Sequence, residues 1–343
     1  MARPKKNAGN SENNEEAIKE GLSDKEIQLQ LAISALRKQF GPEIIQSGEA
    51  GASMDVQFNS TGIFSVDRAL GGGLPEGRII EVFGPESGGK TTLCLTYIAN
   101  MQREGKLAAF IDVEHAFDPR WATTLGVDVN LLLISQPDNG EQALEVLEAL
   151  VRTGYVHVVV LDSVAALVPK KELEGDMGDH NVGAHAKLMS QAMRKLTAVI
   201  SKSHTTAIFI NQIREKVGVM FGNPETTTGG RALKFFSSQR IEVRRVESVK
   251  EGDKDVGNRV KIKVVKNKVS APGQVAEYEL RFDSGIDRLS DMIEVGEKVG
   301  LIEKSGSWYT YEGKRAQGVK QLKELLRADP ELEALLLSQL KES

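Results

Sequence analysis

Residues 84–92 read GPESGGKTT and match the pattern G-x-x-x-x-G-K-[ST], in which a glycine-rich backbone cradles the phosphates of a nucleotide. The apolar run RIIEVF precedes this segment, and the helical stretch KTTLCLTYIANMQREG begins within it. This order of strand, loop and helix is the context that the pattern requires, so the sequence predicts a phosphate-binding loop. Lys90 is expected beside the β and γ phosphates, and the Thr91 hydroxyl is expected to bind Mg²⁺. The predicted contacts to the nucleotide are Gly84, Pro85, Glu86, Ser87, Gly88, Gly89, Lys90, Thr91 and Thr92.

The sequence around this loop, from about residue 53 to residue 286, follows one repeating pattern. Apolar runs such as LAAFID, LLLIS, VHVVVLD and TAIFIN alternate with helical stretches. This alternation predicts an α/β fold, with a mainly parallel sheet covered by helices on both faces. After residue 236 the runs alternate apolar and polar residues with no helix between them, which predicts antiparallel strands at the end of the sheet. The predicted fold is therefore a P-loop NTPase core.

The N-terminal part of the chain has a different composition. Residues 1–22 are polar and are predicted to be a disordered extension. Residues 23–52 are predicted to form a helix and a linker, because Ser23 and Glu26 make a capping box ahead of apolar residues at helical spacing. From the residues alone, the apolar stripe of this helix packs either on its own domain or on a neighbouring subunit.

Residues 287–343 are predicted to form a separate small α+β domain. They contain a helical stretch, the aromatic hairpin GSWYTYEGK and two helical pieces around Pro330. The aromatic residues Trp308, Tyr309 and Tyr311 are expected to form the core of this domain rather than a stacking platform.

Composition limits the classes of function. The formal net charge is −4, so the chain lacks the overall basic character of many nucleic-acid binders. The only cysteine is Cys94, which excludes a disulfide framework and a cysteine zinc site and is expected to be a buried thiol. The N-terminus has no apolar segment typical of a secretory signal, and no apolar run approaches the length of a membrane span. We therefore expect a cytoplasmic protein.

Polar residues end several of the predicted strands. Asp162 ends VHVVVLD, where ligands of open α/β sheets bind, and is expected to hold Mg²⁺ through water. Glu114 follows LAAFID and is expected to polarise the water that attacks the γ-phosphate, although Asp112 is equally near the strand end. Gln212 follows TAIFIN and is expected to end that strand, where its amide would sense the γ-phosphate.

Two long segments without periodicity leave the sheet near the predicted nucleotide edge, at about residues 174–187 and 213–231. Structureless segments of this length in a compact domain are usually functional or disordered. Their backbone amides, threonines and basic residues are suited to grip a phosphate backbone, and the alternative is mobile loops that bind nothing. The basic residues are Lys187, Arg194, Arg214 and Arg231.

Five stretches of this sequence together resemble the bacterial RecA recombinase family. They are GPESGGKTT, DVEHAFDP, VVVLDSVAALVPK, INQIREKVGVMFGNPETTTGGRALKFFSS and KIKVVKNKVSAPG. The resemblance covers about residues 24–340, and FGNPETTTGG and KNK are more specific to it than the phosphate loop. It implies a DNA-dependent ATPase that polymerises on single-stranded DNA as a helical filament and pairs that strand with homologous duplex DNA. It also implies that the filament stimulates self-cleavage of the SOS repressor.

The resemblance implies roles for individual residues. Glu114 would be the catalytic carboxylate, Asp162 the magnesium-site acid and Gln212 the γ-phosphate sensor. ATP would lie between adjacent subunits, with Asp118 and Trp121 holding the adenine. Lys266 and Lys268 would reach the neighbour's nucleotide.

The remaining implied roles concern DNA and assembly. Phe235 would lie at the subunit interface, and the helix at 24–40 would dock on the next core. The DNA site would line the filament axis, which leaves the outer surface free to be acidic. The implied DNA contacts are Lys187, Ser190, Arg194, Arg214, Gly229, Gly230 and Arg231.

The sequence departs from the family pattern at several positions. Val182 and Val217 stand where longer apolar residues are expected in the DNA loops, and Lys187 stands where arginine is common. Phe282 replaces a tyrosine near the nucleotide base, and the long acidic tail of many members is missing, so restraint of duplex binding by a tail is expected to be weak.

Three other functions fit parts of the pattern. A ring helicase has a related core, but FGNPETTTGG and KNK weigh against it. A repair ATPase with a zinc module is excluded in its usual form by the single cysteine. A nucleotide-gated scaffold that does not hydrolyse ATP is disfavoured by the presence of Glu114 and Lys90.

Overall fold

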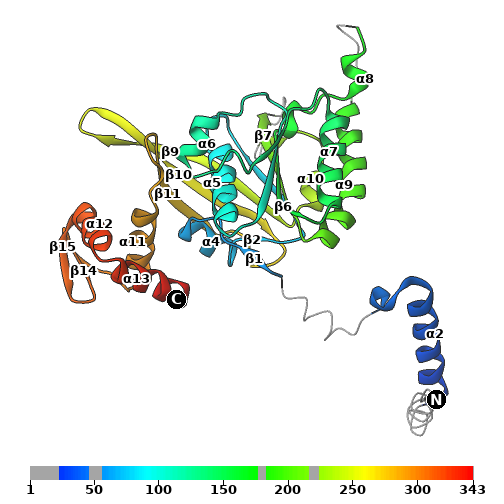
Figure 1. Cartoon of the computed structure of the whole chain (residues 1–343), viewed down its shortest axis with the longest axis horizontal. Helices are drawn as coiled ribbons and strands as arrows, with labels where there is room; N and C mark the ends of the chain where they lie inside the picture. Colours follow the sequence, from blue (N-terminus) through cyan, green and yellow to red (C-terminus); the bar gives the residue numbers. More distant parts are fainter. Residues whose placement is uncertain (1–22, 46–55, 177–182, 216–223, 343) are drawn as a thin grey trace, which may run out of the picture. The chain divides into compact units, whose positions relative to one another are not determined.

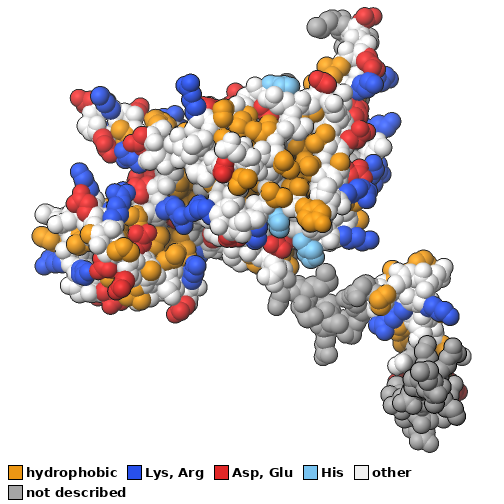
Figure 2. Space-filling view, viewed as in Figure 1, with side chains coloured by type: hydrophobic (Ala, Val, Ile, Leu, Met, Phe, Trp, Pro, Cys, Tyr) orange, Lys and Arg blue, Asp and Glu red, His pale blue; other side chains and the backbone are white. Residues whose placement is uncertain are grey.

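The computed structural model describes residues 23–45, 56–176, 183–215 and 224–342. The chain divides between Asp55 and Val56 into two compact units. In the first unit, α2 (Asp24–Phe40) is followed by the short η1 (Pro42–Ile44). The backbone N–H and the hydroxyl of Ser23 both donate to the Glu26 carboxylate, at 2.7 and 2.8 Å. Every side chain of α2 is at least partly exposed, and its apolar residues lie at the surface of this unit (Figure 2).

A large sheet organises the second unit (Figure 1). Parallel strands lie side by side in the order β3 (Ile79–Gly84), β7 (Thr206–Glu215), β6 (Val156–Asp162), β4 (Leu107–Asp112) and β5 (Leu133–Ser135). Beyond β3 follow β9 (Gln239–Glu251), β10 (Lys254–Asn267), β11 (Val275–Arg281) and β12 (Gly285–Ile286). Strands β10 to β12 are antiparallel to their neighbours, as predicted, whereas β9 runs parallel to β3.

Helices cover both faces of this sheet. One face packs against α4 (Phe64–Leu70), α5 (Lys90–Arg103) and α6 (Pro119–Thr124), and the other against α7 (Gly140–Arg152), α9 (Ala184–Ser203) and α10 (Ala232–Phe236). In β4, Phe110 points to the first face and its neighbours Ala109 and Ile111 to the second. Burial on both faces explains why these strands read as continuous apolar runs. Cys94 is a free, buried thiol in α5, as expected.

Short elements connect these layers. Strand β1 (Phe58–Asn59) pairs with β2 (Leu74–Pro75), and η2 (Val164–Ala166) and α8 (Lys170–Leu173) follow β6. Strand β8 (Glu225–Thr227) pairs antiparallel with the end of β7, so part of the predicted 213–231 loop is a hairpin.

The C-terminal residues form their own apolar core. The elements are α11 (Arg288–Lys298), β13 (Glu303–Ser305), β14 (Trp308–Tyr311), β15 (Lys314–Gln317), α12 (Gly318–Ala328) and α13 (Pro330–Glu342). Tyr309 and Tyr311 are buried in this core, and Trp308 is half-buried beneath the Arg315 guanidinium, 4.4 Å from its ring centre. None of the helices in the described ranges is long and apolar enough to cross a bilayer.

Candidate functional site

The carboxyl ends of β3, β7, β6 and β4 meet at one edge of the sheet, because these neighbouring strands are parallel. In the strand register Gly84 pairs with Gln212, and Asp112 pairs with Asp162. The fold therefore brings the phosphate-loop sequence together with Asp162 and Gln212, as predicted. Gln212 does not end its strand, however, because β7 continues to Glu215 and pairs there with β8.

The phosphate loop joins the end of β3 to the first turn of α5. A Cβ atom at Gly84 would lie 2.0 Å from the Val243 carbonyl oxygen of β9, so no larger residue fits there. The Lys90 ammonium folds back over the loop and donates to the Pro85 carbonyl at 2.7 Å. Burial lowers the pKa of Lys90, against the opposing effects of Asp162, Glu114 and Glu86. A helix N-terminus and a buried ammonium together favour a bound polyphosphate.

Thr91 and Asp162 form a hydroxyl–carboxylate pair below this loop. The Thr91 hydroxyl donates to Asp162 Oδ2 at 2.6 Å. Asp162 is 8% exposed, and burial raises its pKa to about 6, although the hydrogen bond from Thr91 acts in the opposite direction. Oxygen donors of this kind suit Mg²⁺, which normally keeps several waters and binds protein through one or two side chains and substrate phosphates. The pair therefore fits a magnesium site.

Asp112 and Glu114 differ clearly in their surroundings. The buried Asp112 carboxylate accepts hydrogen bonds from the backbone of Ala116 and Phe117 and from the Gln136 amide, at 2.9 to 3.1 Å. It therefore holds the loop after β4. Glu114 is exposed at the sheet edge, so its carboxylate is the one of the two that is available to a substrate water.

Gln212 connects Glu114 to the strand that leaves the site. Its Nε2 donates to Glu114 Oε1 at 3.0 Å, and its Oε1 accepts from Arg214 Nη2 at 2.9 Å. Arg214 Nη1 also lies 3.8 Å from Glu86 Oε1 in the phosphate loop. A group bound at the loop can therefore alter contacts that reach into the 213–231 segment.

Asp118 and Trp121 lie at the start of α6. The Asp118 carboxylate caps the helix by accepting from the backbone N–H groups of Arg120 and Trp121, at 2.8 and 3.3 Å. The Trp121 indole N–H donates to the Thr92 hydroxyl at 3.2 Å, which places the aromatic ring beside the first turn of α5. This position is compatible with the predicted contact to a nucleobase.

Helix α9 carries part of the predicted DNA-contacting set. It begins at Ala184, directly after Gly183 with a φ of 83°, so residues 184–187 are helix rather than the predicted loop. Lys187, Ser190 and Arg194 recur at helical spacing and share one side of α9. Val182 and Val217 lie outside the described residues.

Gly229 and Gly230 pack closely against the beginning of α9. Their φ angles are 79° and 76°. A Cβ atom at Gly230 would lie 2.9 Å from Ala186 Cβ, and one at Gly229 would lie 3.1 Å from Met189 Cγ. Arg231 follows as the N-cap residue of α10. The described ends of the two predicted loops are therefore neighbours, although they are far apart in the sequence.

The Lys266 and Lys268 side chains are hydrogen-bonded to backbone carbonyls of α10. Lys266 Nζ donates to the carbonyls of Lys234 and Phe235 at 2.7 and 3.0 Å, and Lys268 Nζ donates to the Phe235 carbonyl at 3.4 Å. Lys266 is in register with Arg240, which pairs with Glu81, three residues before Gly84. These lysines thus lie back along the sheet from the loop edge of their own protomer. The Phe235 side chain is 67% exposed.

Sequence reasoning missed three polar residues: Ser163 and Asn211 near this edge, and Glu81 farther back in β3. Ser163 donates a short hydrogen bond to Glu114. Glu81 and Asn211 are fully buried and hydrogen-bonded to each other at 3.0 Å. The sequence did contain a feature that could have identified Glu81 and Asn211. Each is a polar residue within an apolar strand run, RIIEVF or IFINQ, and such residues are rarely buried without a hydrogen-bond partner.

Comparison with known proteins agrees with this geometry. The model of the RecA N-terminal domain matches residues 27–287, and that of the RecA C-terminal domain matches residues 290–343. "Protein RecA" of Heliobacterium modesticaldum is 56% identical over 316 residues, which cover 91% of each chain. "Protein RecA" of Chlorobium limicola is 53% identical over 334 residues, or 96% of this chain and 95% of that one.

Proposed function

Because this chain belongs to the RecA family, a family of recombinases that act in DNA repair, we propose that it is a DNA-dependent ATPase that forms helical filaments on single-stranded DNA. The filament would catalyse homologous pairing and strand exchange in recombinational repair. One observation carries this proposal beyond family membership: Gln212 hydrogen-bonds Glu114 at the nucleotide edge and also begins the segment that leads to Gly229 and Gly230.

The proposed chemistry is hydrolysis of ATP to ADP and phosphate. Lys90 and the loop amides hold the phosphates, and Thr91 and Asp162 hold Mg²⁺, which neutralises phosphate charge when bound. Glu114 orients the attacking water, and Gln212 contacts the γ-phosphate. Asp118 and Trp121 hold the adenine.

Assembly would complete the nucleotide site. Lys266 and Lys268 of one protomer would reach the nucleotide of the next, in the manner of a trans arginine finger. Their position away from the phosphate loop of their own protomer supports this role. Phe235 would lie at the subunit interface and α2 would dock on the neighbouring core, which accords with the exposed apolar side chains of both.

DNA, single- or double-stranded, would bind where the two loops converge. Lys187, Ser190, Arg194, Arg214 and the segment Gly229–Arg231 would contact its phosphate backbone. The formal net charge of −4 is compatible with such a local site on a filament axis. By family resemblance alone, the filament would also stimulate self-cleavage of the SOS repressor, and the protein would act in the cytoplasm.

ATP hydrolysis measured with and without single-stranded DNA tests the proposal most directly, with particles imaged from the same samples. We expect DNA to raise the turnover of ATP many-fold and to produce filaments. Equal turnover with and without DNA, or closed rings in place of filaments, would contradict it.

A further inference from the structure

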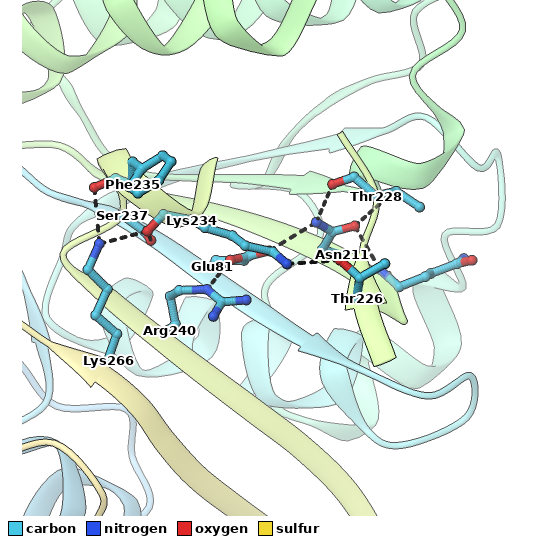
Figure 3. A network of polar contacts seen from close by, with 10 residues as sticks. Glu81, Asn211, Thr226, Thr228, Lys234, Phe235, Ser237, Arg240 and Lys266 are labelled. Atoms are coloured by element: carbon cyan, nitrogen blue, oxygen red, sulfur yellow. Dashed lines mark hydrogen bonds and ion pairs between the residues drawn. The ribbon is translucent and has the colours of Figure 1, made fainter. Parts of the chain in front are cut away.

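Asn211 uses all of its hydrogen-bonding capacity in one network (Figure 3). Its Nδ2 donates to Glu81 Oε1 at 3.0 Å and to the Thr228 carbonyl at 3.1 Å. Its Oδ1 accepts from the backbone N–H of Gln212 at 2.9 Å and from the Thr228 hydroxyl at 2.5 Å. An asparagine amide has two donors and two acceptor positions, so this side chain is saturated.

Glu81 anchors this arrangement inside the sheet. It lies within β3, is fully buried, and accepts from the Arg240 guanidinium at 2.5 Å as well as from Asn211. Arg240 is itself fixed over the Phe83 ring, 4.5 Å from its centre. A buried carboxylate that loses a hydrogen-bond donor is strongly destabilised. The Asn211 amide is therefore held in one orientation.

Asn211 is hydrogen-bonded to two segments. Any effect of a bound nucleotide on the proposed DNA-binding loop would have to pass between these two segments. One is Gln212, which hydrogen-bonds Glu114 at the nucleotide edge. The other is Thr228, which directly precedes Gly229 and Gly230 against α9. Asn211 thus joins the beginning and the end of the 213–228 segment through a single side chain.

We propose that Asn211, anchored by Glu81, is a positioning residue that makes Gln212 and Thr228 move as one piece. This inference rests on the proposed function and adds to it the physical connection between the γ-phosphate sensor and the loop end. When Gln212 shifts toward a γ-phosphate, the shift passes through the Asn211 amide to Thr228 and then to the two glycines. Asn211 itself touches no substrate in this scheme.

A comparison of two buried asparagines tests this role. Asn100 in α5 is also buried and donates to a backbone carbonyl, that of Ser60, at 2.9 Å. Asn211→Ala removes four hydrogen bonds, one of them to the buried Glu81, and should lower the melting temperature more than Asn100→Ala, which removes the bond to Ser60. Asn100→Ala therefore controls for the loss of a buried asparagine in the functional readouts. The readouts are affinity for a non-hydrolysable ATP analogue, ATP turnover with and without single-stranded DNA, and backbone hydrogen exchange at residues 225–231 with the analogue alone.

We expect Asn211→Ala to change affinity for the analogue by less than about threefold but to lower DNA-stimulated turnover by about tenfold or more, the effect of losing one or two buried hydrogen bonds that position the sensor. It should also abolish the change in hydrogen exchange that the analogue causes at 225–231. Asn100→Ala should keep both properties. Thr228→Val is a second variant, which removes one hydroxyl from a half-buried position and keeps the hydrogen bond between Asn211 and Glu81. It should reduce DNA-stimulated turnover and the exchange response in the same direction, but less than Asn211→Ala.

A double variant at positions 211 and 81 tests whether the hydrogen bond between the two side chains can be restored. Asn211→Asp places a second carboxylate against Glu81 and should be worse than Asn211→Ala. Adding Glu81→Gln restores a donor–acceptor pair with its direction reversed, so the double variant should recover part of the lost coupling.

The inference is overturned if Asn211→Ala and Thr228→Val keep the analogue-induced change in exchange, or if Asn100→Ala loses DNA stimulation to the same extent. Failure of the proposed function looks different. In that case the unaltered protein shows no stimulation by DNA, while the exchange experiment with the analogue alone still decides whether Asn211 couples Gln212 to Thr228.

Discussion

Glu114 and Asp112 show how a difference at single residues assigns a chemical role. Asp112 is the last residue of β4 and Glu114 lies two residues beyond it, so the order of residues alone leaves either as the base. The structure separates them, because Asp112 accepts three hydrogen bonds that hold a loop whereas Glu114 faces the site. Glu114 also accepts hydrogen bonds, but from Ser163 and Gln212 at the nucleotide edge. Which partners each carboxylate meets depends on how the chain turns after the strand, and sequence spacing does not contain that information.

We predict that Glu114→Gln stops ATP hydrolysis and leaves binding of ATP and DNA intact. The amide has nearly the same shape but cannot accept a proton, so turnover should fall by about 100-fold or more. Phosphate release at saturating ATP measures this, and a fluorescent nucleotide measures binding. Asp112→Asn is the matched control and should chiefly lower stability. If Glu114→Gln turns over normally and Asp112→Asn does not, Asp112 is the better candidate.

Among the elements, α10 and the two lysines that contact it, Lys266 and Lys268, illustrate the limits of pattern reading. Both lysines lie in the alternating run NRVKIKVVKNKV, which predicted a strand but not the element that the strand contacts. In the structure both lysines donate to the last carbonyls of α10, a common way to satisfy a helix C-terminus. An ammonium has three N–H donors, and these contacts use two at Lys266 and one at Lys268.

We predict that Lys266→Ala spares ATP binding by dilute protein but blocks hydrolysis in filaments, because the trans charge is lost. Lys263→Ala, an exposed lysine on the same strand, is the control and should hydrolyse ATP normally. Turnover is measured with single-stranded DNA at protein concentrations where filaments are visible. Normal turnover by Lys266→Ala filaments would refute the trans role.

At the scale of the whole second unit, an acidic residue of the C-terminal elements, Asp291, is buried against α4 of the core, which carries the partly buried Asp67. Asp291 of α11 accepts from the Ser65 backbone of α4 at 3.1 Å. Two residues later on α4, Asp67 accepts from the Thr61 backbone at 2.7 Å and from the hydroxyls of Ser60 and Thr61. Burial raises the pKa of Asp67 to about 6, and the charge of Asp291 contributes in the same direction. The pKa of Asp291 is also raised, mainly by burial.

This pair predicts a characteristic dependence of stability on pH. The folded protein holds the Asp67 proton more tightly than the unfolded chain, whose carboxyl titrates near its ordinary pKa of about 3.9. The stabilisation is therefore complete below about pH 4 and is lost as pH rises to about 6, where the charged form must stay buried. Relative to Asp67→Asn, the unaltered protein should lose at most about 3 kcal/mol over this interval and remain level above it.

Thermal unfolding of both proteins between pH 4 and 7.5 checks this expectation. Asp253→Asn, the same change at an exposed position, is the control. A difference between the unaltered protein and Asp67→Asn that grows in favour of the unaltered protein with rising pH would have the wrong sign and would contradict the assignment.

The sequence by itself determined the phosphate loop, the parallel core, its antiparallel extension and the small C-terminal domain. These features are local: glycine spacing, runs of apolar residues and helical periodicity express backbone conformation and burial within a few residues. Only the tertiary structure decided that Gly84 pairs with Gln212, that Asn211 meets Glu81 and Thr228, and that Lys266 lies against α10. Strand order and register set these contacts, and both depend on packing across the whole sheet, which no short stretch of sequence encodes.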